Sequence, residues 1–343
     1  MRDSSPDAAQ LGIQVASGDR QALARLLTWI EGSDPRADTA ELHLGDSAAP
    51  EAYVVGITGA PGGGKSTLVN ALLSKLRTRG LTVGVIAVDP SSPYTGGAML
   101  GDRVRMTDHL TDDAVFIRSM ANRGQLGGLA GAVPRAMRAM QSYGFDWILV
   151  ETVGVGQVEV DIAGQADSTI VVVTPGWGDD IQASKSGIME IADLFVVNKA
   201  DRPGAEDTRG VITTVLKMNP LNESRWSAPV VLAVAETSDV VDLLDALERH
   251  RAYATDTGEL VQRRMRRRVA EWRSDVIRKV VQRANDVLDS PRFDCLRDQV
   301  ATAALSPADA ARAVVDDPAT WSADELGVIV SESYSPYSYD DYA

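Results

Sequence analysis

Apolar and polar positions alternate between two kinds of segment over the middle of the chain. From residue 53 to about residue 247, short apolar runs rich in β-branched residues alternate with segments of helical periodicity. The runs are YVVGIT, LTVGVIAVD, AVFIRSM, WILVET, STIVVVT, LFVVNKA and PVVLAVA. Because they are continuously apolar, we expect strands that are buried on both faces. The pattern therefore predicts an α/β domain with a doubly wound, mostly parallel sheet.

Helical patterns flank this domain on both sides. Upstream, DRQALARLLTWIE has helical spacing, and Ser17 is a candidate for its N-cap. Downstream, residues 261–288 form a long helical pattern whose apolar residues are spaced by three, four or seven. The sequence predicts four parts: an N-terminal helical extension (1–50), the α/β domain (51–248), a C-terminal helical arm (249–317) and an acidic, disordered tail (318–343).

The overall composition is that of an acidic globular protein. Of the 343 residues, 44% are hydrophobic and 24% are charged, and the net charge is -14. This charge argues against broad nucleic-acid binding, which needs a basic surface. The single cysteine, Cys295, excludes an intramolecular disulfide framework, and we expect it to be a small buried residue. Without an apolar signal core or a membrane-spanning run, we expect a cytoplasmic protein without membrane contact.

One basic segment departs from this acidity. Residues 249–283 carry 11 Lys or Arg and only 4 Asp or Glu. A basic helix can contact nucleic acid or an anionic membrane. Since the whole chain is acidic, we favour a packing or dimerisation arm with a charged outer face.

A complete P-loop motif lies between the first apolar run and a helical segment. The spacing G-x4-G-K-S, followed by threonine, occupies Gly59, Ala60, Pro61, Gly62, Gly63, Gly64, Lys65, Ser66 and Thr67. The glycines let backbone N–H groups face phosphate oxygens, and the following helix N-terminus favours negative charge. We expect Lys65 to reach the β- and γ-phosphates and Ser66 to bind Mg²⁺. The motif predicts a nucleotide triphosphate site.

The sequence N-K-x-D at the end of a later strand indicates which base is bound. It places Asn198, Lys199 and Asp201 at the expected carboxyl edge of the sheet. An aspartate carboxylate can accept hydrogen bonds from both N1–H and the exocyclic amine of guanine, and adenine cannot supply that pair. We therefore predict GTP rather than ATP. Val234, Ala235 and Glu236 are candidates to offer a backbone N–H to guanine O6.

Three acidic residues end or follow predicted strands near the P-loop. Asp89 ends one strand, Asp102 lies in the following loop, and Glu151 ends WILVE. Such hard carboxylates suit Mg²⁺, together with Ser66. Glu151 begins Glu-Thr-Val-Gly, whose Gly154 can donate its N–H to a γ-phosphate and so sense hydrolysis.

The residue after Gly154 is Val155, where Ras-like enzymes have a glutamine that orients water. Valine cannot orient a water molecule. We therefore expect slow unaided hydrolysis, with charge stabilisation from another residue.

Five segments together resemble the MeaB/ArgK family of P-loop GTPases. They are GAPGGGKST, VDPSSPYTGGAMLGDRVRM, ETVGVGQVEVD, GDDIQASKSGIMEIADLFVVNKAD and RRMRRRVAEW. The resemblance implies a metallochaperone-type GTPase fold with an N-terminal helical extension. It also implies a homodimer formed through a C-terminal helical arm. The expected activity is that of a G-protein chaperone of methylmalonyl-CoA mutase and related adenosylcobalamin-dependent acyl-CoA mutases.

The resemblance also assigns residues. Ser66, Asp89, Asp102 and Glu151 match the Mg²⁺ site of the family. The loop PGWGDDIQASKSG matches a third, family-specific switch, in which Lys185 takes the place of a lysine that moves towards the nucleotide when the mutase binds. A cation there can offset charge that develops during phosphoryl transfer. We therefore expect Lys185 to be catalytic, with Lys65 and Gly154.

Some residues depart from the family pattern. The usual Ser-Ala pair is Val234-Ala235 here, and Ser238-Asp239-Val240 replaces a Gly-x-Gly. Side-chain contacts to the base at these positions are therefore not implied. Trp177 and Ser186 are unusual in the third switch, which leaves the identity of the mutase open.

Other functions remain as alternatives to a GTP-hydrolysing chaperone. A nickel-insertion GTPase of the same superfamily typically carries a Cys/His cluster, and this chain has one cysteine and three scattered histidines, His43, His109 and His250. A kinase, an older assignment for the family, needs a catalytic base for a second substrate, and no such base is recognisable. The intact Lys65, Ser66, Asp89 and Glu151 argue against a protein scaffold whose nucleotide is only structural. Direct cobalamin contact also stays open.

Overall fold

The computed structural model describes residues 7–45, 51–90, 109, 111–122, 132–152, 158–176, 188–218 and 226–316. Of residues 89–90, 121–122, 158–161 and 188, only the backbone is described. Two compact units make up the chain, Met1–Glu271 and Trp272–Ala343. The predicted acidic tail lies outside the described residues, and the four-part division of the chain stays a prediction.

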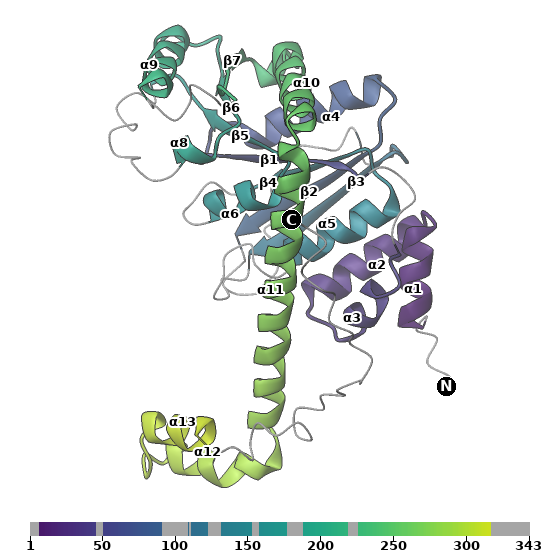
Figure 1. Ribbon diagram of the computed structural model, residues 1–343, viewed down its shortest axis with the longest axis vertical. Coiled ribbons are helices and arrows are strands. Elements are labelled where there is room, and N and C mark those ends of the chain that lie inside the picture. Colours follow the sequence, from purple (N-terminus) through teal and green to yellow (C-terminus); the bar gives the residue numbers. More distant parts are fainter. Residues whose placement is uncertain are drawn as a thin grey trace, which may run out of the picture. The chain divides into compact units, whose positions relative to one another are not determined.

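A seven-stranded sheet forms the centre of the first unit (Figure 1). Its spatial order is β3-β2-β4-β1-β5-β6-β7, and all the strand pairs are parallel. The strands are β1 (Tyr53–Gly59), β2 (Val83–Pro90), β3 (Val115–Asn122), β4 (Trp147–Glu151), β5 (Ser168–Val173), β6 (Leu194–Asn198) and β7 (Val230–Ala233). Each arises from one of the seven predicted apolar runs, so the predicted fold class is confirmed.

Helices cover both faces of this sheet. They are α4 (Lys65–Thr78), α5 (Ala132–Tyr143), α6 (Val158–Gln165), α8 (Ile188–Ile191), α9 (Ala205–Lys217) and α10 (Val241–Asp256). One core joins α4 and α10 to the sheet face that carries Val55 and Ile57. A second core joins α5 and α6 to the face that carries Val54 and Val150. Figure 1 shows α4 and α10 on one side of the strands and α5 on the other.

Strand β1 lies at the centre of the sheet. It pairs with β4 on one side and β5 on the other, and all seven of its residues are buried. In an open parallel sheet, ligands bind outside the carboxyl ends of the strands. The P-loop follows β1 directly, so the topology places it at the middle of that edge.

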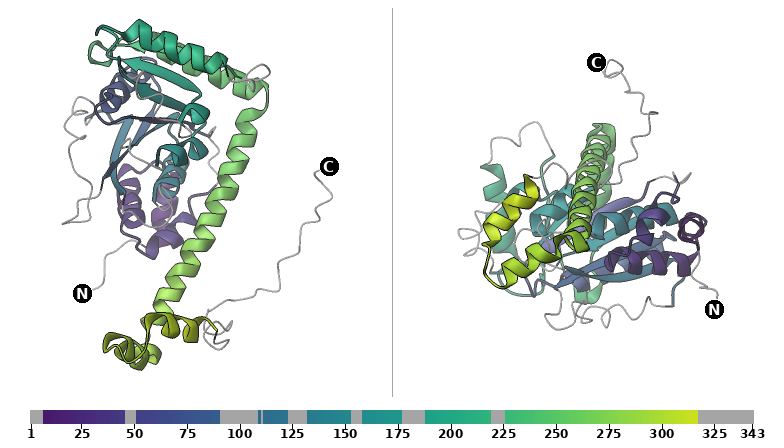
Figure 2. Two further views of the ribbon diagram at one scale, coloured as in Figure 1. Left: turned by 90° about the vertical axis from the view of Figure 1, so that its left-hand side faces the viewer. Right: turned by 90° about the horizontal axis from the view of Figure 1, so that it is seen from below.

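Three N-terminal helices, α1 (Ala8–Ala16), α2 (Arg20–Glu31) and α3 (Arg36–Glu41), pack beside α5, as both views of Figure 2 show. Their apolar residues join the core on the α5 side of the sheet. Ion pairs reinforce the contact, because the buried Arg135 of α5 bonds to Asp38 at 2.6 Å and Glu41 at 2.7 Å. The extension is thus an integral part of the first unit.

The predicted N-cap of α2 is wrong. Asp19, not Ser17, caps the helix, and its carboxylate accepts hydrogen bonds from the N–H groups of Gln21 and Ala22. Ser17 instead ends α1, where its hydroxyl donates to the carbonyl of Ile13. Gly18 separates the two helices with a φ of 85°, so the chain turns between these residues.

The predicted long helix is present as α11 (Glu259–Leu288). Within the first unit, its charged side does not point outward as predicted. Arg263, Arg264 and Arg267 are half-buried or buried and form ion pairs with acidic residues at the amino edge of the sheet. Two arginines, Arg266 and Arg268, are exposed. The arginine side of the helix is therefore largely a packing surface, because acidic partners there neutralise its charge.

The second unit contains the rest of α11, the short 3₁₀ turn η4 (Pro291–Phe293), α12 (Asp294–Ala301) and α13 (Pro307–Val315). Among its described residues, 272–316, the buried apolar ones are Phe293, Ala310 and Val314. Cys295 is exposed, which corrects the expectation that it is buried. In the described parts of the chain, no helix is both long and apolar enough to span a bilayer.

A glycine exchange tests the packing of the N-terminal helices. A Cβ atom added at Gly12 of α1 would lie 2.1 Å from the backbone oxygen of Ala40, whereas one added at Gly210 of α9 meets nothing within 4 Å. We predict that Gly12→Ala destabilises the protein by about 1–3 kcal/mol through this overlap. The control Gly210→Ala stabilises it by up to about 1 kcal/mol through helix propensity. Urea unfolding measures both changes, and a shared sign would contradict the packing.

Candidate nucleotide-binding site

The P-loop backbone adopts conformations that glycine favours. From the last residue of β1 to the residue before α4, Gly59, Gly62 and Gly64 have φ values of 133°, 75° and 86°. A Cβ at Gly59 would lie 2.1 Å from the backbone oxygen of Val172, so the loop passes close to β5. A Cβ at Gly64 would lie 2.4 Å from the side-chain amide of Asn198. The glycines therefore allow both the turn and its close contacts.

The buried side chain of Lys65 contacts the backbone of this loop. It is 6% exposed, and its ammonium donates to the carbonyls of Gly59 at 2.7 Å and Ala60 at 3.1 Å. Lys65 is also the first residue of α4, so its charge adds to the partial positive charge of the helix N-terminus. Thr67 follows in the first turn of α4. This arrangement can hold an anionic phosphate chain.

Ser66 and Glu151 place two side-chain oxygen groups that can bind a metal ion beside the P-loop. The hydroxyl of Ser66 donates to the Glu151 carboxylate at 2.6 Å, and both side chains are buried. These elements meet because β4, which ends at Glu151, pairs with β1 next to the P-loop. A hydroxyl and a carboxylate are the hard oxygen ligands that Mg²⁺ prefers, so the pair fits a magnesium ion.

Two of the predicted base-recognition residues, Asn198 and Lys199, contact the P-loop directly. Asn198 ends β6, and its amide nitrogen donates to the carbonyl of Gly63 at 2.9 Å. The ammonium of Lys199 donates to the carbonyl of Gly62 at 2.8 Å. Asp201 lies two residues further on and is exposed. The structure thus brings N-K-x-D and the phosphate loop together.

A second loop adjoins this one at the end of β7. Val234 directly precedes the short 3₁₀ helix η3 (Ala235–Thr237), and Ala235 and Glu236 are its first two residues. The backbone N–H of Ala235 donates to the side-chain oxygen of Asn198 at 3.2 Å. Asn198 therefore connects the β7 loop to the P-loop.

Several predicted site residues lie outside the described residues. These are Asp102, Gly154 and Lys185, together with Val155, Trp177 and Ser186. Asp89 lies at the carboxyl end of β2, but its side chain is not described. Of the four predicted metal ligands, the described side chains are thus those of Ser66 and Glu151, and the functional roles of all the predicted residues remain proposals.

Sequence analysis missed a buried charged cluster at the opposite edge of the sheet. Asp167 precedes β5 and Asp193 precedes β6, and both are bound by arginines of α11. Burial acts to raise the pKa of Asp193, but hydrogen bonds from His250 and Arg263 outweigh it and hold the pKa below its usual value. The sequence signal that could have indicated this cluster is an aspartate directly before each of two continuously apolar runs.

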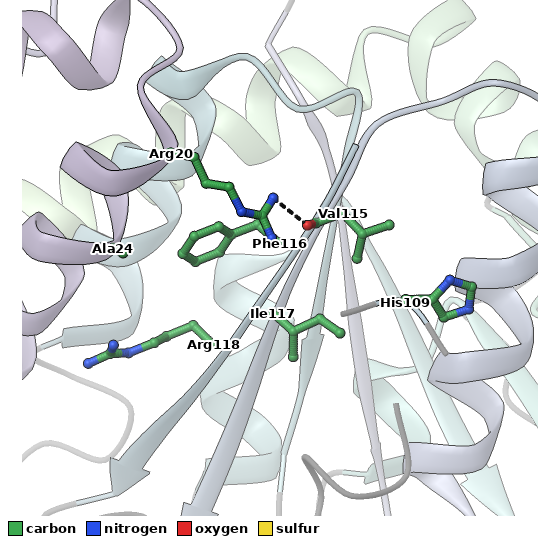
Figure 3. A pocket seen from close by; sticks show the side chains of 7 residues that line it. All are labelled: Arg20, Ala24, His109, Val115, Phe116, Ile117 and Arg118. Atoms are coloured by element: carbon green, nitrogen blue, oxygen red, sulfur yellow. Dashed lines mark hydrogen bonds between the residues drawn. The ribbon is translucent and has the colours of Figure 1, made fainter. Parts of the chain in front are cut away.

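A cavity of about 240 Å³ lies away from the P-loop, beside the first half of β3 (Figure 3). Its lining includes Arg20, Phe116, Arg118 and His109. Arg20 donates to the carbonyl of Val115 at 2.7 Å, and Arg118 forms an ion pair with Glu31. These arginines cover the edge of the sheet, where β3 lacks a second neighbour in the described sheet.

The all-parallel sheet and the loop after its central strand define a P-loop GTPase fold. A family model described as "Methylmalonyl Co-A mutase-associated GTPase MeaB" matches residues 23–288. The match spans most of the chain, and the chain belongs to this family of GTPases.

Individual relatives agree with this assignment. The chain is 43% identical over 306 residues to a putative GTPase of Pyrococcus horikoshii, covering 88% of this chain and 96% of the relative. It is 31% identical over 267 residues to the Mus musculus protein named methylmalonic aciduria type A homolog, mitochondrial, covering 73% of this chain and 64% of that protein. A solved structure titled LAO/AO transport system kinase matches with a TM-score of 0.65 and 27% identity, covering 92% of this chain and 99% of that one.

The exchange Glu151→Gln tests the metal site. Glutamine can still accept the Ser66 hydrogen bond but removes one negative charge from the oxygen pair. We predict that the Mg²⁺ concentration for half-maximal GTP hydrolysis rises about tenfold or more. Thermal stability measured without Mg²⁺ serves as the control and should not fall. An unchanged Mg²⁺ requirement would remove Glu151 from the metal site.

Proposed function

We propose that this GTPase is a chaperone that gates the loading or protection of adenosylcobalamin in an acyl-CoA mutase such as methylmalonyl-CoA mutase. The client rests on the description of the family, which names a mutase-associated GTPase. The observation that carries the gating is the contact of Asn198 with both the P-loop and the β7 loop. Because Asn198 joins the P-loop to the loop after β7, a bound nucleotide can change the positions of both loops at once. GTP hydrolysis can change the conformation of a client protein only if that client binds the GTP-bound and GDP-bound states with different affinities.

The proposed chemistry is hydrolysis of GTP to GDP and phosphate. Lys65 and the P-loop N–H groups would hold the phosphates, and Ser66 and Glu151 would bind Mg²⁺ with Asp89 and Asp102. The metal would neutralise charge on the phosphate oxygens. Gly154 would sense the γ-phosphate, and Lys185 would supply a positive charge to the reaction when the client binds.

Guanine selectivity would come from Asp201, which lies beside Asn198 and Lys199 on the same loop. We predict that Asp201→Asn weakens GTP binding by about tenfold to a hundredfold, because an amide offers guanine one acceptor instead of two. Xanthine has a carbonyl in place of the exocyclic amine and fits the amide, so xanthosine triphosphate should bind more tightly than in the parent. Competition binding measures both affinities. A retained preference for GTP would exclude Asp201 as the reader of the base.

Mixing the protein with candidate adenosylcobalamin-dependent mutases tests the client. We predict a complex, and GTP hydrolysis that the correct mutase accelerates. Lys185→Ala should retain nearly the parent affinity for GTP but lose the acceleration, because the cation acts in the transition state. The exposed Lys217 of α9 gives the control exchange Lys217→Ala, which should respond to the mutase as the parent does. Equal acceleration of all three proteins would remove Lys185 from the mechanism.

We further propose that the protein is a homodimer. In the second unit, α11 exposes Trp272 (67%), Val276 (44%) and Val280 (59%), which recur every four residues. Large apolar side chains exposed at helical spacing are typical of a helix that packs against a partner. A second copy of this chain is the proposed partner, as the resemblance to the family implies.

The exchange Trp272→Glu tests this dimer. A carboxylate at the first position of this apolar row would have to be buried without a counter-charge, so we predict a shift from dimer to monomer. Sedimentation velocity at several concentrations measures the mass. Asn285→Asp is the matched control, because it adds the same charge at an exposed residue on another side of the helix. A dimer that survives Trp272→Glu, or a monomeric parent, would contradict the proposal.

A further inference from the structure

Two aspartates occupy equivalent places at the amino edge of the sheet. Asp167 precedes β5 directly, and its carboxylate accepts the N–H of Val54 in β1 at 3.0 Å. Asp193 precedes β6 directly, and its carboxylate accepts the N–H of Thr169 in β5 at 2.8 Å. Both side chains are almost fully buried. Each aspartate thus joins the start of its own strand to the neighbouring strand.

Arginines from one turn of α11 bind both aspartates. Arg263 forms a fork with the two carboxylate oxygens of Asp193, at 2.7 and 2.8 Å. Arg264 and Arg267 both bind Asp167, at 2.8 and 3.2 Å. We call these five residues the arginine clasp. Such bidentate, charge-assisted bonds fix geometry as well as contribute energy.

A third aspartate shows that an aspartate before a strand does not need arginine partners. Asp146 precedes β4, and its carboxylate accepts the N–H of Thr82 at 2.7 Å. This contact resembles those of Asp167 and Asp193, although Thr82 directly precedes β2 instead of lying within it. Asp146 is exposed, however, and among the described contacts no arginine of α11 reaches it. The arginines are an additional feature of two strands, β5 and β6.

These two strands follow the two predicted switch segments. In the sequence, residues 153–157 lead into α6 and residues 177–187 lead into α8. Only Ala166 separates the end of α6 from Asp167, and only Ala192 separates the end of α8 from Asp193. Each predicted switch is therefore followed by a helix, one alanine and a clasped aspartate.

Close packing makes α6 a stiff link in this series. Its Ile162 is fully buried, and a Cβ added at Gly56 of β1 would lie only 2.6 Å from the Ile162 side chain. Arg267 also donates to the carbonyl of Gln165, the last residue of α6, at 3.0 Å. A shift of α6 must therefore move either β1, which leads to the P-loop, or the partners of Arg267, because packed interiors do not absorb such shifts.

We propose that the arginine clasp couples the nucleotide state to α11, so that the segments following Gly154 and preceding α8 act on this helix through Asp167 and Asp193. This inference rests on the proposed switch roles of those segments. The two nucleotide states differ in how firmly the clasp holds residues 259–271 of α11. By thermodynamic linkage, loosening the clasp changes the relative affinity for GTP and GDP by the same factor.

Hydrogen–deuterium exchange of the full-length parent is the first test. The protein is loaded with GDP or with a non-hydrolysable GTP analogue, and exchange is followed at the amides of residues 259–271. We predict rates that differ about fivefold or more between the two states, the usual lower range of allosteric coupling. Equal rates in both states, with nucleotide bound, overturn the inference.

A pair of matched variants makes the test specific. Arg263→Gln removes the fork to Asp193, whereas Arg266→Gln alters an exposed arginine of the same turn whose one described hydrogen bond is to Gln262. Arg263→Gln should abolish the state dependence and shift the ratio of GTP to GDP affinity about fivefold or more. Arg266→Gln should leave both as in the parent. A state dependence retained in Arg263→Gln contradicts the coupling.

A further pair covers the case in which Arg263→Gln does not fold. Asp193→Asn and Asp146→Asn both preserve an acceptor for the neighbouring strand, but only the first removes a clasped charge. Loss of state dependence in Asp193→Asn alone supports the clasp, and equal behaviour of the two variants opposes it.

The experiment also separates this inference from the proposed function. The exchange measurement contains no mutase, so its result does not depend on the proposed client. If the exchange rates of α11 are the same in both nucleotide states, and a mutase still accelerates GTP hydrolysis in a separate assay, only the clasp proposal fails. Failure to bind any guanine nucleotide removes both.

Discussion

The side-chain amide of Asn198 is the contact on which the arrangement of the candidate site depends. Its nitrogen donates to the carbonyl of Gly63, and its oxygen accepts from the N–H of Ala235. The amide is almost fully buried, so loss of either bond would leave a buried polar group unpaired, at a cost of about 1–3 kcal/mol. Neither the P-loop nor the β7 loop can move far without breaking one of these bonds.

This constraint explains why Gly64 must lack a side chain. A Cβ there would collide with the Asn198 nitrogen at 2.4 Å and push the base-recognition loop away from the phosphate loop. Lys199 adds a second contact to the same loop through Gly62. These contacts hold the P-loop, the N-K-x-D loop and the β7 loop together without a nucleotide, which would lower the cost of ordering these three loops on binding.

The two edges of the sheet carry different tasks. The carboxyl edge holds the P-loop and its partners, and the amino edge holds the arginine clasp. Strand β6 connects them, since Asp193 directly precedes this strand and Asn198 ends it. Four buried residues separate these two side chains along β6. The clasp is therefore one short strand away from the base-recognition loop.

The sheet and the P-loop could be predicted from the sequence because their signals are local. Buried parallel strands need continuous apolar runs, and a phosphate loop needs glycines at fixed spacing. The place of Asn198 at the carboxyl edge of the sheet followed from the N-K-x-D motif, although its contacts with the P-loop did not.

The clasp could not be predicted, because its partners are separated by 70 to 100 residues. The arginines of α11 were interpreted as a solvent-exposed face of the helix. Nothing in the sequence near α11 indicates that buried carboxylates of distant residues bind these arginines. The N-cap error at Ser17 has a different origin. The N-cap is the residue directly before the first helical residue, and that residue is Asp19, whereas Ser17 lies two positions earlier.

The central claim is that one preorganised pocket joins guanine recognition to phosphate binding. Isothermal titration of the full chain with GTP and with ATP, both with Mg²⁺, tests this claim most directly. The account predicts that GTP binds about a hundredfold or more tightly than ATP, because adenine would leave the Asp201 carboxylate unpaired. Equal affinities for the two nucleotides would contradict it.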